Sequence, residues 1–142
     1  ERTMETPTGL LFKQIHDKLE KQANNTLRQQ GLTMMQVSVL LTIQGAEGKR
    51  CSMKELERFF GVAQSTVAGV VSRLEQKGLV TATGAPEDRR VKLVCITESG
   101  EKCCGQAACH MDQAEERLLR GFSPEERAQL KSLLVRVADN LN

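Results

Sequence analysis

The chain has 142 residues, of which 39% are hydrophobic and 27% charged, a balance typical of one soluble globular domain. No apolar run approaches the roughly 18 residues that a membrane-spanning helix needs. The N-terminal stretch lacks the apolar core of a secretory signal, so we expect a cytoplasmic protein without a membrane partner. There is no Trp or Tyr and there are only 4 Phe, which predicts an aliphatic core.

Positive charge is concentrated in the middle of the chain, although the formal net charge is only +2. Residues 51–92 carry seven basic and five acidic side chains, whereas residues 97–142 carry six basic and eight acidic ones. A local basic surface says more about a polyanionic partner than the total charge does, so this distribution favours nucleic-acid binding.

Four helices are predicted in the first half of the chain. Apolar residues recur every four positions over residues 8–30, as on one face of a helix. Capping boxes at residues 33–36 and 52–55 start a second and a third helix, with a loop at 45–49 between them. Apolar spacing predicts a fourth helix over residues 64–77. The third helix is expected to bury Leu56, Phe59 and Phe60.

The third and fourth helices are short and are separated by Gly61 and Val62. This arrangement is typical of a helix-turn-helix, whose second helix enters the DNA major groove. Residues 79–83 and 91–96 are rich in β-branched side chains and predict two strands. The segment 84–90 between them holds Gly, Pro and four charged residues, which predicts a solvent-exposed hairpin tip, or wing.

Two more helices complete the predicted fold. Thr97 caps a fifth helix, and Ser123-Pro124-Glu125-Glu126 is a strong start for a sixth. The first and last helices carry apolar stripes with no sheet to cover, and an exposed apolar face usually marks a partner surface. We therefore expect a homodimer. The stripes consist of Leu11, Ile15 and Leu19, and of Leu130, Leu134 and Leu141.

The predicted fold class is mainly α with a small β-hairpin wing (α+β), a winged helix-turn-helix with N- and C-terminal dimerisation helices. Residues 1–142 are expected to form a single domain. Within it, residues 33–97 form the DNA-binding part, and residues 8–30 and 98–142 form the dimerisation helices.

Three segments carry a family resemblance. They are Ser52–Val67, Arg73–Val80, and the wing pattern Asp88-Arg-Arg followed by Ile96-Thr-Glu-Ser-Gly. Together they resemble the MarR family of winged helix-turn-helix transcriptional regulators over about residues 33–100. The Asp-x-Arg of the wing is the most specific element. The resemblance implies a homodimer that binds a palindromic operator in double-stranded DNA, usually as a repressor, and that is often released by a small molecule or by thiol oxidation.

The sequence departs from the family pattern at two places. Ala63 occupies a position where relatives often have Ser as the N-cap of the fourth helix, and Ala in that role costs ~1 kcal/mol. The sensor residues of some relatives are also absent, since there is no reactive Cys early in the first helix and no paired His on the fifth.

DNA contacts are expected from the fourth helix and the wing. The first turn at residues 64–66 is polar and suits base reading, although any exposed first turn would also be polar. Arg73 is expected to contact a phosphate, and Arg90 is expected to enter a narrow minor groove. Asp88 is expected to hold the wing loop in its conformation. The alternative is that these charges only solvate an edge hairpin and a helix face. The predicted DNA-binding set is Gln64, Ser65, Thr66, Gly69, Ser72, Arg73, Arg89, Arg90 and Lys92.

The family resemblance also implies an effector pocket, which His16, Met34 and Met35 would line together with the fifth helix. We expect no cofactor and no metal, because the Cys spacings match no zinc template and His16 and His110 are the only histidines. A buried, unreactive thiol is the default for each cysteine, although Cys95 sits on a strand face that could be exposed. The cysteines are Cys51, Cys95, Cys103, Cys104 and Cys109.

The sequence is also compatible with two alternatives to a ligand-released DNA-binding repressor. One is a thiol-based redox-sensing regulator of the same fold, and the other is a winged-helix module that binds proteins. An enzyme is not expected, because no local signature joins a nucleophile to an oriented base. The salt dependence of binding distinguishes a nucleic-acid partner from a protein partner, because DNA binding weakens steeply as the salt concentration rises.

Overall fold

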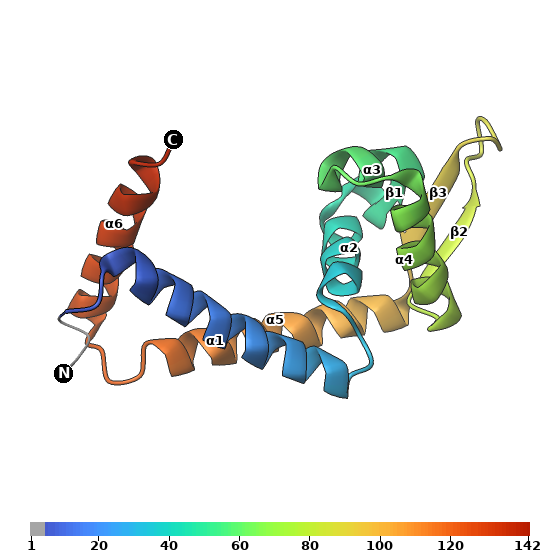
Figure 1. Cartoon of the computed structure of the whole chain (residues 1–142). Helices are drawn as coiled ribbons and strands as arrows, with labels where there is room; N and C mark the ends of the chain where they lie inside the picture. Colours follow the sequence, from blue (N-terminus) through green and yellow to red (C-terminus); the bar gives the residue numbers. More distant parts are fainter. Residues whose placement is uncertain (1–4) are drawn as a thin grey trace. The chain divides into compact units, whose positions relative to one another are not determined.

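A computed structural model describes residues 5–142, and the chain forms two compact units, one up to Cys104 and one over Gly105–Asn142. Figure 1 shows the order of the elements. They are α1 (Thr8–Gln29), α2 (Met34–Gly45), the 3-10 turn η2 (Glu47–Lys49), β1 (Arg50–Ser52), α3 (Met53–Phe60), α4 (Gln64–Gln76), β2 (Val80–Gly84), β3 (Lys92–Ile96), α5 (Glu98–Leu118) and α6 (Pro124–Asp139). This sequence of elements is a winged helix-turn-helix with flanking helices, as predicted.

Local capping starts the helices where the sequence predicts. The Thr33 hydroxyl accepts from the Gln36 amide at 3.1 Å, and the Gln36 side chain accepts from the Thr33 amide at 3.2 Å. The same reciprocal box starts α3 at Ser52 and α6 at Ser123, where Pro124 occupies the first turn. Each box satisfies backbone donors that the helix itself leaves unpaired.

The sheet has three strands, whereas the sequence pattern predicts two. β3 is central, with β1 and β2 antiparallel on either side of it. Arg50 pairs with Cys95 and Ser52 pairs with Leu93, so the end of the predicted loop continues directly into a strand. With only three residues, β1 is too short to display an alternating pattern, and its position depends on pairing with a segment more than forty residues away.

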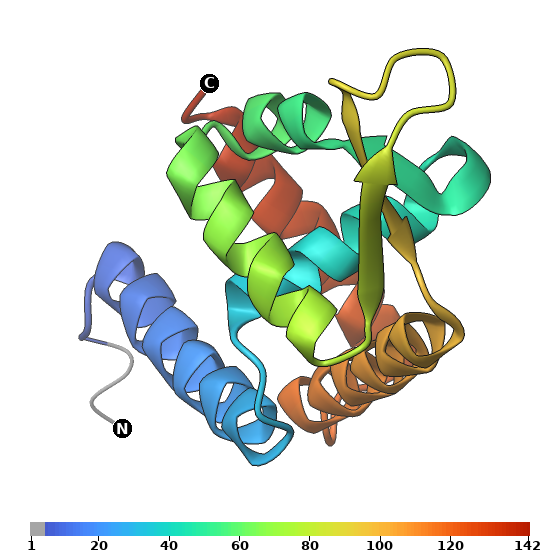
Figure 2. The ribbon, with the colours of Figure 1, turned by 90° about the vertical axis from the view of Figure 1, so that its right-hand side faces the viewer.

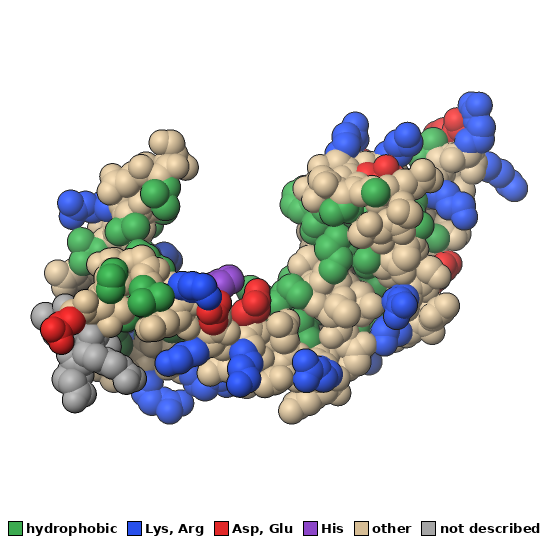
Figure 3. All heavy atoms as spheres, in the orientation of Figure 1, with side chains coloured by type: hydrophobic (Ala, Val, Ile, Leu, Met, Phe, Trp, Pro, Cys, Tyr) green, Lys and Arg blue, Asp and Glu red, His purple; other side chains and the backbone are tan. Residues whose placement is uncertain are grey.

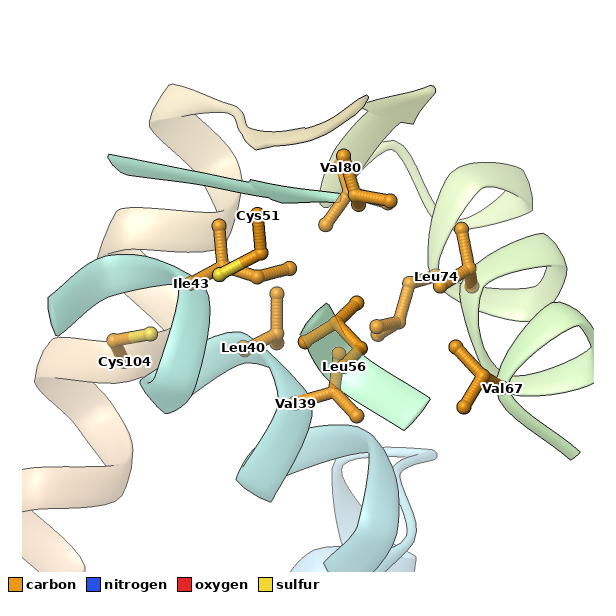
Figure 4. Close-up of a cluster of buried hydrophobic side chains, with 11 residues drawn as sticks. Val39, Leu40, Ile43, Cys51, Leu56, Val67, Leu74, Val80 and Cys104 are labelled. Atoms are coloured by element: carbon orange, nitrogen blue, oxygen red, sulfur yellow. The ribbon is translucent and has the colours of Figure 1, made fainter. Parts of the chain in front are cut away.

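An aliphatic core holds the first unit together. Side chains from α2, α3 and α4 point toward a common centre that the sheet closes (Figure 4). α4 also packs beside β2 (Figure 2). The core therefore fixes α4 relative to the sheet and the hairpin. Its largest fully buried side chains are Leu40, Ile43, Leu56, Leu74, Val39, Val67, Val80 and Val94.

Phe59 is not buried as expected, since it is 70% exposed. At about 100° per residue, Met53, Leu56 and Phe60 share one face of α3, and these side chains contact the core. Phe59 lies roughly 95° from the centre of that face. Its ring instead meets the Phe60 ring edge-on, with the centroids 5.0 Å apart.

The outer helices α1 and α6 carry apolar side chains that remain exposed within residues 5–142. In α1, Leu27 is the buried residue, whereas Ile15 is 46% exposed. In α6 no residue is buried, and Leu133 and Leu134 are 44% and 41% exposed. Among residues 5–142, no helix has both the length and the hydropathy needed to cross a bilayer.

Candidate nucleic-acid interface

α4 presents a polar face opposite its buried one. Val67, Val71 and Leu74 anchor the helix in the core. Gly61 allows the tight turn before it, since its φ of 64° is left-handed, and its amide donates to the Glu57 carbonyl. The predicted DNA-facing residues of this helix are all exposed, namely Gln64, Ser65, Thr66, Gly69, Ser72 and Arg73.

The N-terminus of α4 has no side-chain cap, because Ala63 stands at the N-cap position. The amides of Thr66 and Val67 donate to the Ala63 carbonyl. The uncapped start of a helix carries partial positive charge, which suits a phosphate oxygen. A Cβ added to Gly69 would meet open space, so this glycine leaves a flat patch on the exposed face.

The wing is an ordered loop held by Asp88. Its carboxylate accepts from the Arg90 amide at 3.0 Å and from Nε and Nη2 of the Arg90 guanidinium at 3.1 Å each. These side-chain and backbone hydrogen bonds hold the pKa of Asp88 below its ordinary value. Asp88 therefore joins the backbone and the side chain of Arg90 within the wing loop.

Backbone contacts complete the wing. The Ala85 amide donates to the Val91 carbonyl at 2.7 Å, and the Val91 amide donates to the Asp88 carbonyl at 2.9 Å. A Cβ on Gly84 would lie 2.9 Å from the Arg89 carbonyl oxygen, so the loop closes tightly over this glycine. Ala85 is 4% exposed, which anchors the base of the loop.

The wing tip presents cations to solvent. Arg89, Arg90 and Lys92 are exposed, and the Arg90 side chain keeps 91% of its surface despite the pair with Asp88. Figure 3 shows Lys and Arg side chains at the hairpin tip. The uncapped start of α4 and a cationic wing therefore belong to the same compact unit.

The structure separates the three residues predicted for an effector pocket. Met34 lines a cavity of about 490 Å³ between the end of α1, the start of α2 and the end of α4. Met35 packs instead against the core. His16 is exposed on α1, with its Nε2 3.6 Å from a Glu20 carboxylate oxygen.

Several residues of this cavity are not among the predicted sites. Arg28 and Lys77 line it, and the Lys77 ammonium donates to the Gly31 carbonyl at 2.7 Å. The contact joins residues 46 positions apart, and no local pattern in the sequence signals it.

The cysteines differ in their surroundings, and all five are free thiols. Burial raises the pKa of Cys51, Cys103 and Cys104, which favours the unreactive protonated thiol. Cys109 is exposed, which contradicts the expectation that each thiol is buried, and Cys95 is half-buried. Within residues 5–142, no three His, Cys, Asp or Glu side chains group as metal ligands would.

Comparisons with known proteins agree with this geometry. A family model described as the MarR family matches residues 30–91. The fold is similar to that of MepR, a transcription regulator of the Staphylococcus aureus multidrug efflux pump MepA, with TM-score 0.87, 23% identity, and 96% of this chain and 100% of that chain covered.

Two other solved structures are somewhat more similar in sequence. The reduced form of MarR from E. coli is 27% identical, with TM-score 0.76 and with 93% of this chain and 96% of that chain covered. BpsR of Bordetella bronchiseptica, whose DNA binding is regulated by 6-hydroxynicotinic acid, is 26% identical, with TM-score 0.68 and with 94% of each chain covered.

Proposed function

We propose that the chain is a winged helix-turn-helix transcriptional regulator of the MarR family, whose model matches residues 30–91, and that it binds a palindromic operator in double-stranded DNA as a homodimer. It acts as a repressor that a small molecule releases. MepR has been solved with DNA, and the DNA binding of BpsR responds to a small molecule. We assign the chain no catalytic role and place it in the cytoplasm.

This proposal is supported by two exposed surfaces of the same compact unit, the first turn of α4 and the wing. The first turn of α4 exposes Gln64, Ser65 and Thr66, whose amide and hydroxyl groups can donate to and accept from base edges in a major groove. The wing holds the Arg90 guanidinium in the open, where it suits the negative potential of a narrow minor groove. Arg73, Ser72 and Lys92 then contact the backbone and fix the register.

The homodimer accounts for the exposed apolar stripes of the outer helices. Residues 8–30 and 98–142 form the dimerisation helices, and residues 33–97 form the DNA-binding part. A two-fold axis places two copies of α4 in successive major grooves, about 34–36 Å apart. The expected operator is therefore an inverted repeat.

The salt dependence of DNA binding tests the cationic part of this interface. Removal of one cation that displaces a counterion from DNA, whether at a phosphate or in a groove, makes the plot of log affinity against log salt shallower by about one. Arg90→Ala is therefore expected to lower affinity for both operator and scrambled DNA and to reduce the slope by about two per dimer. An unchanged affinity and slope in this variant would mean that the wing is only a solvated hairpin.

A further inference from the structure

Gly69 stands in the interior of α4, where a glycine is unfavourable. The helix runs from Gln64 to Gln76, so Gly69 is five residues from its start. Glycine loses more conformational freedom on folding than any other residue. In a helix interior it lowers the ratio of folded to unfolded protein about fivefold relative to alanine. A glycine at such a position therefore requires an explanation.

The fold of the described chain does not explain this glycine. A Cβ built on Gly69 meets no atom of the described residues within 4 Å. Gly69 is also not among the glycines of residues 5–142 that have a left-handed φ. Gly100 shows the contrast, because a Cβ there would overlap the Leu79 carbonyl oxygen. Neither backbone conformation nor packing within residues 5–142 therefore accounts for Gly69.

Gly69 occupies the outermost line of α4. At about 100° per residue, it lies roughly 165° from the centre of the face that Val67, Val71 and Leu74 bury in the core. Figure 2 shows α4 on the outside of its unit. The part of α4 that lies farthest from the core is therefore bare backbone, and any partner that the helix faces can approach this backbone closely.

The exposed side chains next to Gly69 are short. Ser65, Thr66 and Ser72 lie within about 60° of it on the helix surface, and all three are exposed. Their hydroxyls are one bond beyond Cβ, so they reach a base edge only if the helix backbone comes close to the bases. The major groove is about 12 Å wide and a helix with its side chains is about 10–12 Å across, so the helix fills the groove. A larger side chain in place of Gly69 would touch the base pairs first and hold these hydroxyls away from them.

We propose that Gly69 determines how deeply α4 enters the major groove, and that this depth allows the hydroxyls of Ser65 and Thr66 to contact base edges directly. The inference rests on the proposed function, because it concerns the same DNA interface. Gly69 is then a positioning residue for sequence specificity. Phosphate contacts from longer side chains such as Arg73 do not require this depth, so a side chain in place of Gly69 weakens specific binding selectively.

A glycine without a role in DNA binding predicts a different result. In that case alanine would stabilise the fold and leave the affinity for DNA unchanged. Our inference predicts opposite signs, since Gly69→Ala stabilises the fold through helix propensity and weakens specific DNA binding. A loss of affinity then does not arise from unfolding, because the variant is the more stable protein.

The first measurement combines urea unfolding with fluorescence anisotropy on an operator selected from random DNA and on scrambled DNA. Gly69→Ala is expected to raise the ratio of folded to unfolded protein by up to about fivefold. It should weaken operator binding roughly tenfold, a loss typical of one specific base contact, and leave the affinity for scrambled DNA the same. Gly69→Leu should weaken operator binding further, because its side chain projects farther. Gly105→Ala is the control, since Gly105 is another helical glycine with open space at its Cβ, and it should bind operator as the wild type does.

A double-mutant cycle tests the depth of the helix itself. Ser65→Ala removes a hydroxyl that contacts a base edge in our proposal, so it should weaken operator binding of the wild type roughly fivefold. In the Gly69→Ala background the same change should have no effect, because the hydroxyl is already held away from the bases. Additive losses in the double variant would overturn the positioning role of Gly69.

The outcomes separate this inference from the proposed function. Unchanged operator affinity in Gly69→Ala, or an equal loss on operator and scrambled DNA, would overturn the inference and leave the proposed function standing. An equal loss in Gly105→Ala would also overturn it, because the effect would then belong to any helical glycine. A wild-type protein that does not distinguish operator from scrambled DNA would overturn the proposed function, and this inference with it.

Discussion

Asp88 organises the wing with a single carboxylate, so its removal is expected to act on DNA binding indirectly. Asp88→Asn loses the charge that orients the Arg90 guanidinium. We expect DNA affinity to fall roughly fivefold, since a charge-assisted pair is replaced by a neutral one. Fluorescence anisotropy with labelled operator measures this, and Glu87→Gln is the matched control in the same loop. An equal loss in both variants would indicate a general charge effect and no positioning by Asp88.

The lowered pKa of Asp88 also sets the pH range of this pairing. Because the folded-state pKa lies below the ordinary value of 3.8, the pairing is fully present above that value. It disappears only as the pH falls through the lower folded-state pKa. The wing contribution to DNA binding is therefore expected to be constant between neutral and mildly acidic pH.

Gln64 is expected to act on specificity. Its side chain is exposed at the first turn of α4, where an amide can form a bidentate pair with a base edge. Gln64→Ala should relax preference at one or two base pairs by about 1–3 kcal/mol, while affinity for scrambled DNA stays the same. Competition binding against single-base operator variants measures this. A uniform loss of affinity for all DNA sequences would instead indicate that Gln64 contacts the DNA backbone.

Among the secondary-structure elements, α5 can begin close to the sheet because Gly100 has no side chain. A Cβ there would overlap the Leu79 carbonyl oxygen and lie 2.6 Å from Ile96 Cγ1. The Thr97 hydroxyl closes the same junction, since it donates to the Gly78 carbonyl at 2.7 Å and accepts from the Gly100 amide at 3.1 Å. The first turn of α5 is thus joined closely to the end of the helix-turn-helix.

Gly100→Ala is therefore expected to destabilise the chain by about 1–3 kcal/mol, the usual cost of overpacking. Gly105→Ala is the matched control on the same helix, because a Cβ at that position meets open space. It should stabilise the chain by up to ~1 kcal/mol through helix propensity. Urea unfolding of both variants gives the two free energies. Equal effects of the two substitutions would show that the close packing at Gly100 is unimportant.

The elements also show which features the sequence could predict. The helix starts follow from capping boxes within four residues, and the helix-turn-helix follows from local apolar spacing. β1 and the Lys77–Gly31 contact depend on partners more than forty residues away, so no local pattern reveals them. The prediction for Phe59 is wrong because α3 is only eight residues long, and its buried face is defined by the core around it.

At the scale of the whole molecule, the exposed stripe of α6 is expected to mediate dimerisation. Leu134 is 41% exposed and lies on the same helix face as Leu130 and Val137. Leu134→Arg should produce a monomer in sedimentation velocity, whereas the wild type sediments at about twice 15.7 kDa. Val135→Arg is the matched control, since Val135 is 53% exposed and lies about 100° or more from that stripe. A dimeric Leu134→Arg protein would place the interface elsewhere.

Two copies of this chain are expected to read one inverted repeat through α4 and the wing. Selection of bound sequences from random DNA, followed by hydroxyl-radical footprinting of the selected site, measures whether the protein reads such a repeat. We expect two half-sites about 34–36 Å apart on one face of the duplex, with additional minor-groove protection outside each half-site from the wings. A selection that enriches no sequence, or protection of one short half-site by the full-length protein, would contradict it.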